Sequence, residues 1–539
     1  MRDYLRRTAD EIWVIDCSPD GHQPDVSTRI FQGVQQPVCI VMAARSAAKV
    51  TNEPAKVRFR SLPAGHRLGK FEALSAIDIT DEGWTDCPDG WRDPFLPASS
   101  GAWSTFPALS ELFVYDGSRV MPGRTWVIAP DKQTLADRWE ALTSSPVTEK
   151  EALFQPHLRN GKPGDKHVNK VVSASLAGHE GRAVPVAADD GDVVAPVRYA
   201  FRSFDRQWVI PDSRVINQPN PGLWTSMSPV QVFMTVPHDR TPTAGPALTV
   251  SALIPDLHHY HGRGGRAVPL WLDHAATRSN VRPGLIARIA SAVGADVGAE
   301  DVYSYIVGVV ANPAFTSRFA RDLSTPGLHV PLTADRATFL DVADLGRRVI
   351  WLHTFGERFV DPAVGRPASR PRLPADRAPK VPADGAISTR SGEMADSLGY
   401  DPVKHRLLVG NGFVENVTPA MWDYNVSGMN VLTQWFSYRR ANRERPLMGD
   451  KRPPSKLEKV RPDRWLPEYT TDLLDILNVL GLLIDLEAAQ ADLLEAVCDG
   501  PLISQSDLAD CGAFVLPEGY PLAPFRVVAS EPAAARLFD

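Results

Sequence analysis

The sequence predicts a mixed fold in which an α/β part is followed by a β-rich part and then by helices. Its 539 residues suggest several domains, since one domain usually holds roughly 100–200 residues. Its 47 prolines disfavour an all-helical bundle, because proline cannot donate a backbone hydrogen bond inside a helix. Short apolar runs between loops rich in Gly, Pro and Asp are typical of strands. The 43% hydrophobic and 23% charged content excludes a globally disordered chain.

Two apolar runs near the start predict the first strands. Glu11–Asp16 contains IWVI and Val38–Ala44 reads VCIVMAA, and short runs of this kind suit buried strands of a parallel sheet. Residues 47–150 mix short strands with tryptophan-rich loops, and Leu135–Leu142 has the pattern of a helix. We assign residues 1–150 to a first domain.

The middle of the chain changes from strands to helices. Residues 151–280 contain the β-like runs VVAPVRYAF, QVFMTV and ALTVSALI, which suggest a β-rich module. Residues 281–360 show helical periodicity instead. The expected helices are Leu285–Ala292, Ala299–Ala311, Pro313–Leu323 and Ala334–Phe355. We assign residues 151–360 to a second domain of mixed α+β structure.

A proline-rich connector separates this domain from a last module. Residues 361–392 include six prolines between Pro362 and Pro382, which favours an extended linker. Residues 393–539 begin with a hairpin over His405–Val417, because Asn411-Gly412 is a type I′ turn signal. A helix around Met429–Arg440 and a long amphipathic helix or helical pair over Tyr469–Leu494 complete the module.

The net charge of −6 hides two opposed blocks. Residues 436–464 hold ten basic and four acidic residues, whereas residues 465–512 hold ten acidic residues and neither Lys nor Arg. The basic block is suited to a polyanion. The acidic block is most simply the solvated face of a helix, and a docking surface for another subunit is the alternative.

Cysteine use and hydropathy favour a cytoplasmic protein. The five cysteines are scattered, which fits reduced thiols better than a disulfide framework. The start has no apolar region of the secretory type, and no window holds about 18 apolar residues, so we expect no membrane span. His258, His259 and His261 lie near Asp256 and His274, but their spacing is not that of a closed zinc site and no Cys is near. We expect no metal.

The first segment carries a resemblance to a known enzyme class. DEIWVIDCSPDGHQPDVSTRIFQGVQQPVCIVMAAR resembles the late motifs of N6-adenine DNA methyltransferases, in which a strand, a loop and a returning strand follow the catalytic motif. The resemblance implies that Phe31 stacks on a flipped-out base, which needs an aromatic face in place of its neighbours. The alternative is that Phe31 is a core residue at a strand edge.

Further stretches extend the resemblance to about residue 495. They are LFVYDGSRVMPGRTWVIA, VRYAFRSFDRQWVI, IPDLHHYHGRGGRAVPLWLD, DVYSYIVGVVANPAFTSRFARDL, LGRRVIWLH and VTPAMWDYNVSGMNVLTQWFSYR. In this order they look like the C-terminal half of single-chain Type ISP restriction–modification enzymes. That resemblance implies a partial methyltransferase-like sheet followed by a target-recognition domain.

The motifs that would supply chemistry are missing from this sequence. Adenine methyltransferases use a polar residue followed by Pro-Pro-aromatic, but the sole Pro-Pro here, Pro453-Pro454, lies between Arg452 and Ser455. No Gly-rich loop follows a strand near the start, and there is no Walker motif. We therefore expect this chain to bind no cofactor and to be inactive alone. The resemblance implies that the complete enzyme binds S-adenosylmethionine and that a partner chain carries the cofactor-binding and Pro-Pro-aromatic motifs. It also allows a helicase or nuclease subunit as a further partner.

Arginines in loops or beside aromatic residues are the candidate contacts to double-stranded DNA. Guanidinium groups bind phosphates and guanine edges, and loops present such side chains on a rigid frame. For each group the alternative is a structural ion pair, a solvated face or compensation of a helix dipole. The candidates are Arg119, Arg124, Arg202, Arg206, Arg214, Arg263, Arg266, Arg439, Arg440, Arg443 and Arg445.

The sequence thus predicts recognition of a specific duplex sequence for an adenine-modifying restriction or phage-defence system. Two alternatives stay open. One is a complete methyltransferase whose motifs have diverged, and the other is an interaction subunit that does not bind DNA.

Overall fold

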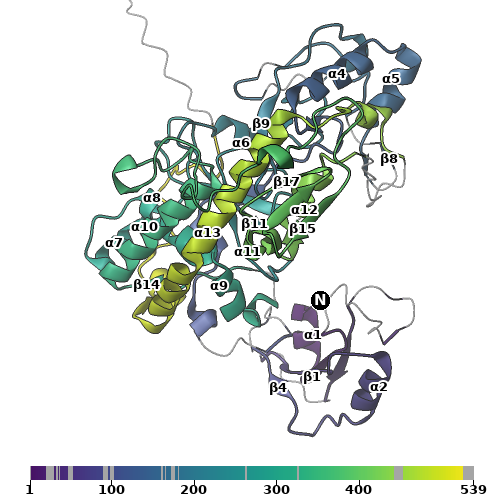
Figure 1. The fold of residues 1–539 in the computed structure, drawn as a ribbon. Helices are drawn as coiled ribbons and strands as arrows, with labels where there is room; N and C mark the ends of the chain where they lie inside the picture. Colours follow the sequence, from purple (N-terminus) through teal and green to yellow (C-terminus); the bar gives the residue numbers. More distant parts are fainter. Residues whose placement is uncertain are drawn as a thin grey trace, which may run out of the picture. The chain divides into compact units, whose positions relative to one another are not determined.

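The structure is a computed structural model that divides into two compact units, Met1–Thr105 and Phe106–Asp539 (Figure 1). It describes residues 2–19, 30–31, 34, 37–46, 53–88, 91, 95–97, 102–159, 162–163, 166–171, 176–179, 181–238, 240–260, 264–324, 327–441 and 453–525. The predicted mixture of α/β and β-rich parts is confirmed: several small sheets alternate with helices. No helix in the described ranges is long and apolar enough to cross a bilayer.

The first unit is built on a four-stranded sheet of order β2-β1-β3-β4. β1 pairs antiparallel with β2 and parallel with β3, and its central residues Ile12–Ile15 are buried as their apolar run predicts. Arg6 is buried and donates to the carbonyl oxygen of Ala55 at 3.1 Å. The elements are α1 (Arg2–Thr8), β1 (Glu11–Asp16), β2 (Cys39–Ala44), β3 (Lys56–Ser61), α2 (Arg67–Ser75), β4 (Thr85–Asp86) and the 3-10 helix η1 (Ala102–Thr105).

The second unit carries the remaining sheets, of orders β12-β11-β13-β5, β6-β10-β9, β15-β16-β17, β14-β20, β18-β19 and β7-β8. Its strands are β5 (Gly117–Ser118), β6 (Ile128–Ala129), β7 (Leu158–Arg159), β8 (Lys162–Pro163), β9 (Val197–Arg202), β10 (Asp205–Val209), β11 (Phe233–Pro237), β12 (Thr249–Ser251), β13 (Gly265–Pro269), β14 (Leu332–Thr333), β15 (Leu398–Asp401), β16 (Arg406–Val409), β17 (Gly412–Val414), β18 (Asn425–Val426), β19 (Met429–Asn430) and β20 (Leu502–Ile503).

Its helices include the four predicted between residues 281 and 360. They are α3 (Leu109–Leu112), α4 (Lys132–Thr143), α5 (Val147–Phe154), α6 (Pro221–Thr225), α7 (Pro283–Val293), α8 (Ala299–Val310), α9 (Pro313–Arg318), α10 (Arg336–His353), α11 (Pro419–Asp423), α12 (Val431–Ser437), α13 (Pro467–Asp499) and α14 (Gln505–Asp510), with the 3-10 helices η2 (Val186–Ala188), η3 (Asp322–Ser324), η4 (Pro362–Val364), η5 (Ala383–Gly385) and η6 (Lys456–Lys459).

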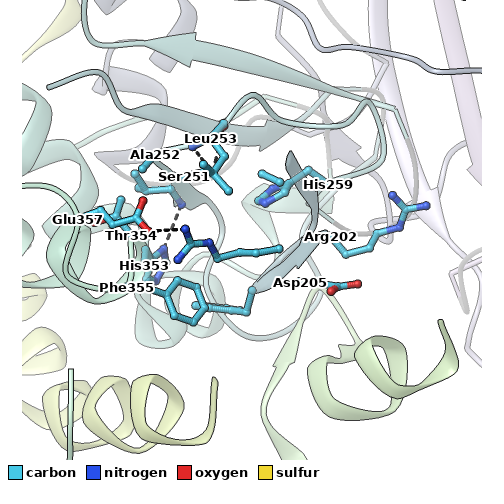
Figure 2. Close-up of a pocket in the computed structure, with 14 residues that line it drawn as sticks. Arg202, Asp205, Ser251, Ala252, Leu253, His259, His353, Thr354, Phe355 and Glu357 are labelled. Carbon is cyan, nitrogen blue, oxygen red and sulfur yellow. Dashed lines mark hydrogen bonds and ion pairs between the residues drawn. The ribbon is translucent and has the colours of Figure 1, made fainter. Parts of the chain in front are cut away.

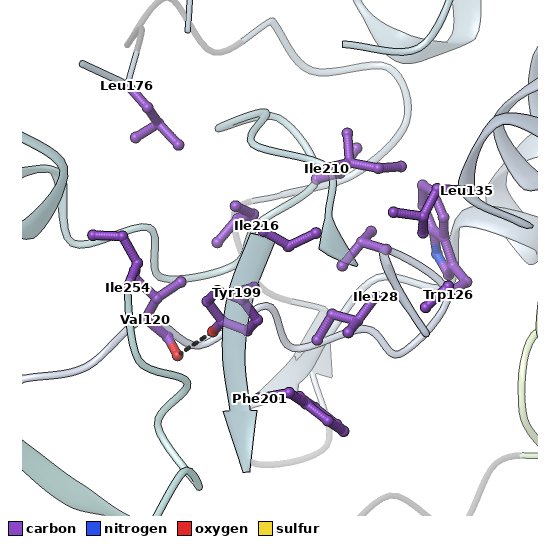
Figure 3. Packing of buried hydrophobic residues seen from close by; sticks show 14 of the residues in the cluster. Val120, Trp126, Ile128, Leu135, Leu176, Tyr199, Phe201, Ile210, Ile216 and Ile254 are labelled. Atoms are coloured by element: carbon purple, nitrogen blue, oxygen red, sulfur yellow. Dashed lines mark hydrogen bonds between the residues drawn. The ribbon is translucent and has the colours of Figure 1, made fainter. Parts of the chain in front are cut away.

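The main core of the second unit surrounds β9 and β10 (Figure 3). Trp126 and Trp139 are fully buried in it together with Tyr199 of β9. The sequence places the end of the first domain at residue 150, whereas the division between the units lies at Thr105. The reason is that the segment with Trp126 and Trp139 supplies apolar side chains to the core around β9.

The long helix α13 organises the C-terminal part of this unit. It contacts α9, α10 and α11, and Figure 1 shows it running past α10 and α11. The segment expected as a linker lies along it: the Leu373 amide donates to Asn478 Oδ1 at 2.8 Å, and Arg377 forms an ion pair with Asp485 at 2.8 Å. Both contacts hold the proline-rich segment against the helix.

The predicted hairpin is confirmed, with a different turn. β16 pairs antiparallel with β17, and Val409 pairs with Gly412, so Gly410-Asn411 form the two-residue loop. Gly410 has a φ of 55°, and a positive φ at the first loop position is the glycine position of a type II′ turn. Asn411, the second loop residue, is not among the residues with positive φ, which excludes type I′. The expected type I′ turn at Asn411-Gly412 is therefore replaced by a type II′ turn that begins one residue earlier.

Candidate nucleic-acid interface

The first group of predicted arginines meets a buried carboxylate, Asp256. Arg202, at the end of β9, forms an ion pair with Asp256 at 2.9 Å and lies over the Phe201 ring at 3.9 Å. The other Asp256 oxygen accepts a hydrogen bond from Tyr199 at 3.0 Å. Burial alone would lower the pKa of Arg202, but Tyr438 and the carboxylate of Asp256 raise it overall. This guanidinium group therefore fixes β9 to the segment that carries Asp256.

Arg206 and Arg214 lie in similar surroundings. Arg206 forms an ion pair with Glu357, and its guanidinium carbon lies 4.9 Å from the centre of the Phe355 ring. Glu357 and Phe355 line the small pocket of Figure 2. Arg214 is fully buried and forms ion pairs with Asp212 at 2.7 Å and with Asp189 at 2.8 Å. Arg214 therefore forms a buried charge cluster with Asp189 and Asp212.

Arg119 and Arg124 bind backbone carbonyl groups. Arg119 donates to the carbonyl oxygens of Arg266, Leu257 and Val236, and burial lowers its pKa to about 9. A Cβ at Gly265 would lie 1.9 Å from Arg119 Nη2, so the glycine makes room for this guanidinium group. Arg124 donates to Val215 O at 2.7 Å and lies over the ring of Phe154.

The remaining candidates differ in exposure. Arg439 is buried, forms an ion pair with Asp205 at 2.9 Å and donates to Trp435 O at 2.9 Å. Arg266 is 30% exposed and pairs with Asp116, whereas Arg440 is exposed. Arg263, Arg443 and Arg445 lie outside the described residues. Among the described candidates, Arg266 and Arg440 are therefore the most accessible, while the others are engaged inside the protein.

The structure brings forward four exposed cations that were predicted only as part of the basic block. These residues, which we call the basic ridge, are Lys456, Lys459, Arg461 and Arg464. Their backbone is held firmly. Ser455 caps η6, Leu457 is buried in the main core, and Arg138 Nε donates to Val460 O at 3.0 Å. The sequence pattern that could have revealed this anchored segment is the pair of apolar residues Leu457 and Trp465 within the run of charges; both are buried.

A cavity of about 630 Å³ lies beneath η6, and we call it the η6 cavity. Residues from β6, β9, β10, α4, α13 and the end of α12 line it together with the segment around η6. Of the basic ridge, Lys456, Lys459 and Arg461 belong to this lining, and Arg439 is the sequence-predicted residue that joins them. The cavity thus brings together cations from two parts of the basic block.

Of the histidine cluster, His259 packs inside the fold, whereas His274 is exposed. His259 is buried and its Nδ1 lies 3.0 Å from Thr235 Oγ1. Burial lowers the pKa of His259 well below its usual range, and nearby Arg119 and Arg202 lower it further. Within the described ranges, no group of three His, Cys, Asp or Glu side chains is placed to hold a metal. His261 lies outside these ranges.

Phe31 is 53% exposed in the first unit. The core alternative considered for this residue requires burial, so the exposure favours an aromatic face that is open to a ligand. Its role in base stacking stays a prediction.

The acidic block on α13 pairs with arginines of the same unit. Asp475 lies 2.6 Å from Arg372 and Asp472 lies 3.4 Å from Arg198. The carboxylates are therefore partly neutralised within the chain, which neither of the two expectations for this block had included.

The sequence model of a family described as the Type ISP C-terminal specificity domain matches residues 111–475, in agreement with the resemblance seen in the sequence. No curated protein matches the chain. Similar solved structures include a nuclease-deletion mutant of the Type ISP restriction–modification enzyme LlaGI in complex with a DNA substrate mimic, with 13% identity and a TM-score of 0.56 over 92% of this chain and 37% of that one. A DrdV–DNA complex has 14% identity and a TM-score of 0.56, over 93% and 49%. The ATP-dependent Type ISP enzyme LlaBIII bound to DNA has 12% identity and a TM-score of 0.56, over 94% and 32%. The chain spans between about a third and a half of these proteins, and the likeness shows a shared fold.

Proposed function

Because the chain belongs to the family of Type ISP C-terminal specificity domains, we propose that it recognises a specific sequence in double-stranded DNA. It does so as the specificity portion of an adenine-specific methyltransferase in a restriction–modification system. The observation that carries the proposal is the family match over residues 111–475. The DNA complexes of LlaGI, DrdV and LlaBIII support it through their shared fold.

The charges of the second unit support a division of labour in this recognition. The exposed cations of the basic ridge neutralise phosphates, which supplies affinity without sequence information. Buried arginines such as Arg119 and Arg202 stiffen the strands from which loops reach base edges in a groove. Binding is then expected to weaken steeply as salt rises, because released counterions supply much of the affinity.

The first unit is proposed to be part of a methyltransferase sheet. Its β2 is an edge strand whose Cys39, Val41, Ala43 and Ala44 are exposed, and further protein that carries the cofactor-binding and Pro-Pro-aromatic motifs would cover it. In the described part of this unit no Gly-rich loop follows a strand; the turn from β3 to α2 holds a single glycine, Gly65. These residues do not fit S-adenosylmethionine, so we assign the cofactor to the complete enzyme. A helicase or nuclease subunit would be a further partner.

The test is duplex binding at several salt concentrations. The four ridge residues are changed to Ala together, and the matched control changes the exposed cations Lys170, Arg278, Arg321 and Lys404. Loss of four phosphate contacts makes the slope of log K against log salt shallower by about 3.6. The control keeps the wild-type slope. Absence of any duplex binding at low salt would refute the proposal in favour of an interaction subunit.

A second measurement addresses the cofactor. Isothermal titration of the chain with S-adenosylmethionine is expected to show no binding. Micromolar binding would instead support the alternative of a complete, diverged methyltransferase.

A further inference from the structure

The η6 cavity has the size of a ligand site. Its volume is about 630 Å³, within the roughly 300–1,000 Å³ typical of small-molecule pockets. It lies within the second unit between the basic ridge and the sheet β6-β10-β9. From its lining we infer that this cavity binds one nucleotide, with the base inside and the phosphate on the ridge. The inference rests on the proposed DNA recognition and names a site for it.

The inner wall suits a flat, apolar ring. Phe201, Tyr438 and Tyr469 line the cavity together with Ile128 and Met394. Phe201 and Tyr438 pack edge to face with ring centres 4.7 Å apart, so their orientation is fixed before a ligand arrives. Aromatic walls of this kind accept any nucleobase, because every base presents a π face.

The polar wall supplies a donor that lacks an acceptor. Arg439 is buried and held by Asp205 and by the Trp435 carbonyl oxygen, yet its Nε–H has no hydrogen-bond partner in the described part of the chain. Gln207, also in the lining, donates to Asp205 at 2.7 Å and is thereby fixed next to it. A buried donor without a partner is costly, and a ring nitrogen or carbonyl oxygen of a base would satisfy it.

The rim suits a phosphate. Lys456, Lys459 and Arg461 are exposed there. Two carboxylates also line the cavity, and both are hydrogen-bonded: Asp131 accepts from Thr134 and from the Tyr469 hydroxyl at 2.7 Å, and Glu458 accepts from the Thr125 hydroxyl. The cations of the lining outnumber them; they are Arg138, Arg439, Lys456, Lys459 and Arg461. The cavity therefore combines an apolar ring-binding wall with an anion-binding rim, which together match a nucleotide better than an inorganic anion or an uncharged apolar molecule.

The nucleotide has two sources, a base that leaves the DNA stack or a free nucleotide. Extrusion costs least at a mismatched or bulged position. A duplex with one bulged nucleotide is therefore expected to bind at least tenfold tighter than the fully paired duplex if DNA is the source. If the ligand is a free nucleotide, the four deoxynucleoside monophosphates bind, and the bulged duplex binds no tighter than the paired duplex.

The test uses the whole chain and two variants. Met394 is half-buried in the lining, so Met394→Trp fills the cavity, and Met394→Leu keeps its volume as the control. Lys459→Glu alters an exposed rim residue and leaves the fold intact. We expect Met394→Trp and Lys459→Glu to weaken binding of the preferred monophosphate, or of the bulged duplex, at least tenfold, while Met394→Leu matches the wild type.

Two results are separable. If no monophosphate binds better than inorganic phosphate and the bulged duplex binds like the paired one, the nucleotide site is refuted although duplex recognition stands. If no duplex binds, but a monophosphate binds and Met394→Trp abolishes that binding, the proposed function fails and the nucleotide site stands.

Discussion

The buried charge cluster of Arg214 gives a sharp test of whether an arginine in this unit is structural. Arg214 Nη2 lies 2.7 Å from Asp212 and 2.8 Å from Asp189, and Nη1 donates to Val184 O at 2.7 Å. Arg214→Ala removes the cation and leaves two buried carboxylates behind. Asp189 keeps Arg182 as a partner at 2.9 Å, but the side chain of Asp212, which is 0% exposed, loses its ion pair.

The expected loss of stability follows from that burial. Breaking a buried ion pair by removing one partner costs about 3–5 kcal/mol. The second unit runs from Phe106 to Asp539, so at about 2.1 cal/mol/K of unfolding entropy per residue its unfolding entropy is about 0.9 kcal/mol/K. The melting temperature of this unit should therefore fall by about 3–5 °C.

Differential scanning calorimetry measures this shift, and Arg321→Ala, at an exposed arginine, is the matched control with no expected change. Duplex affinity is measured in parallel at a temperature where both variants are folded. If Arg214→Ala melts within about 1 °C of the wild type, well below the fall of about 3–5 °C expected from a broken buried pair, and loses duplex affinity, the structural assignment is refuted. Arg214 would then be the DNA contact that its sequence context suggested.

The pH dependence has a defined sign. Burial by itself raises the pKa of the Asp189 carboxyl, but the Gly191 amide and the guanidinium groups of Arg214 and Arg182 lower it overall. A carboxyl with a lower pKa in the folded state stabilises the fold above its unfolded pKa of about 3.9, and this contribution is lost as pH falls through the folded value. The difference in free energy of unfolding between the wild type and Arg214→Ala should therefore become smaller below about pH 4, and calorimetry at several pH values measures it.

Two further predictions concern packing and protonation. Gly346→Ala places a Cβ 1.8 Å from Ser304 O, between α10 and α8, so it should destabilise the second unit by about 1–3 kcal/mol. The control is Gly69→Ala, whose Cβ would have nothing within 4 Å, and which should leave the stability unchanged or raise it. Thermal melting measures both variants. Burial lowers the pKa of His353 to about 3, and its Nδ1 accepts from the Val250 amide. Because the unfolded pKa is about 6.5, stability is lost as pH falls from there, by up to about 1.4 kcal/mol per unit. His353→Gln should show a smaller loss between pH 7 and about 5 in denaturant titrations, and an equal loss would contradict the assignment.

Local sequence pattern predicts the elements of this fold well where one run of residues decides the outcome. The apolar run of Glu11–Asp16 forms the central strand β1, because its side chains are buried on both faces of the sheet. The periodicity of residues 299–311 and 334–355 corresponds to α8 and α10. The hairpin was also predicted, but its turn shifted by one residue because cross-strand register, rather than the Asn-Gly signal alone, fixed it.

The site was less predictable because its contacts join residues far apart in the sequence. Arg439 pairs with Asp205, and Arg202 pairs with Asp256. No local pattern distinguishes an arginine that finds such a carboxylate from one that stays exposed. Lys456 and Lys459 differ from Arg439 only through tertiary structure: buried Leu457 anchors η6 in the core, and its lysine neighbours are left outside.

The same pairing explains how a chain of net charge −6 presents a positive surface. The carboxylates of α13 face arginines, with Asp475 next to Arg370 and Arg372 and Asp485 next to Arg377. Those arginines come from the proline-rich segment, so the acidic block is compensated locally. The basic ridge is exposed beside a cavity whose Asp131 is already hydrogen-bonded to Tyr469. Since the field near a surface depends on nearby charges within about 8–10 Å, the potential at the ridge is set by its own exposed cations although the whole chain is acidic.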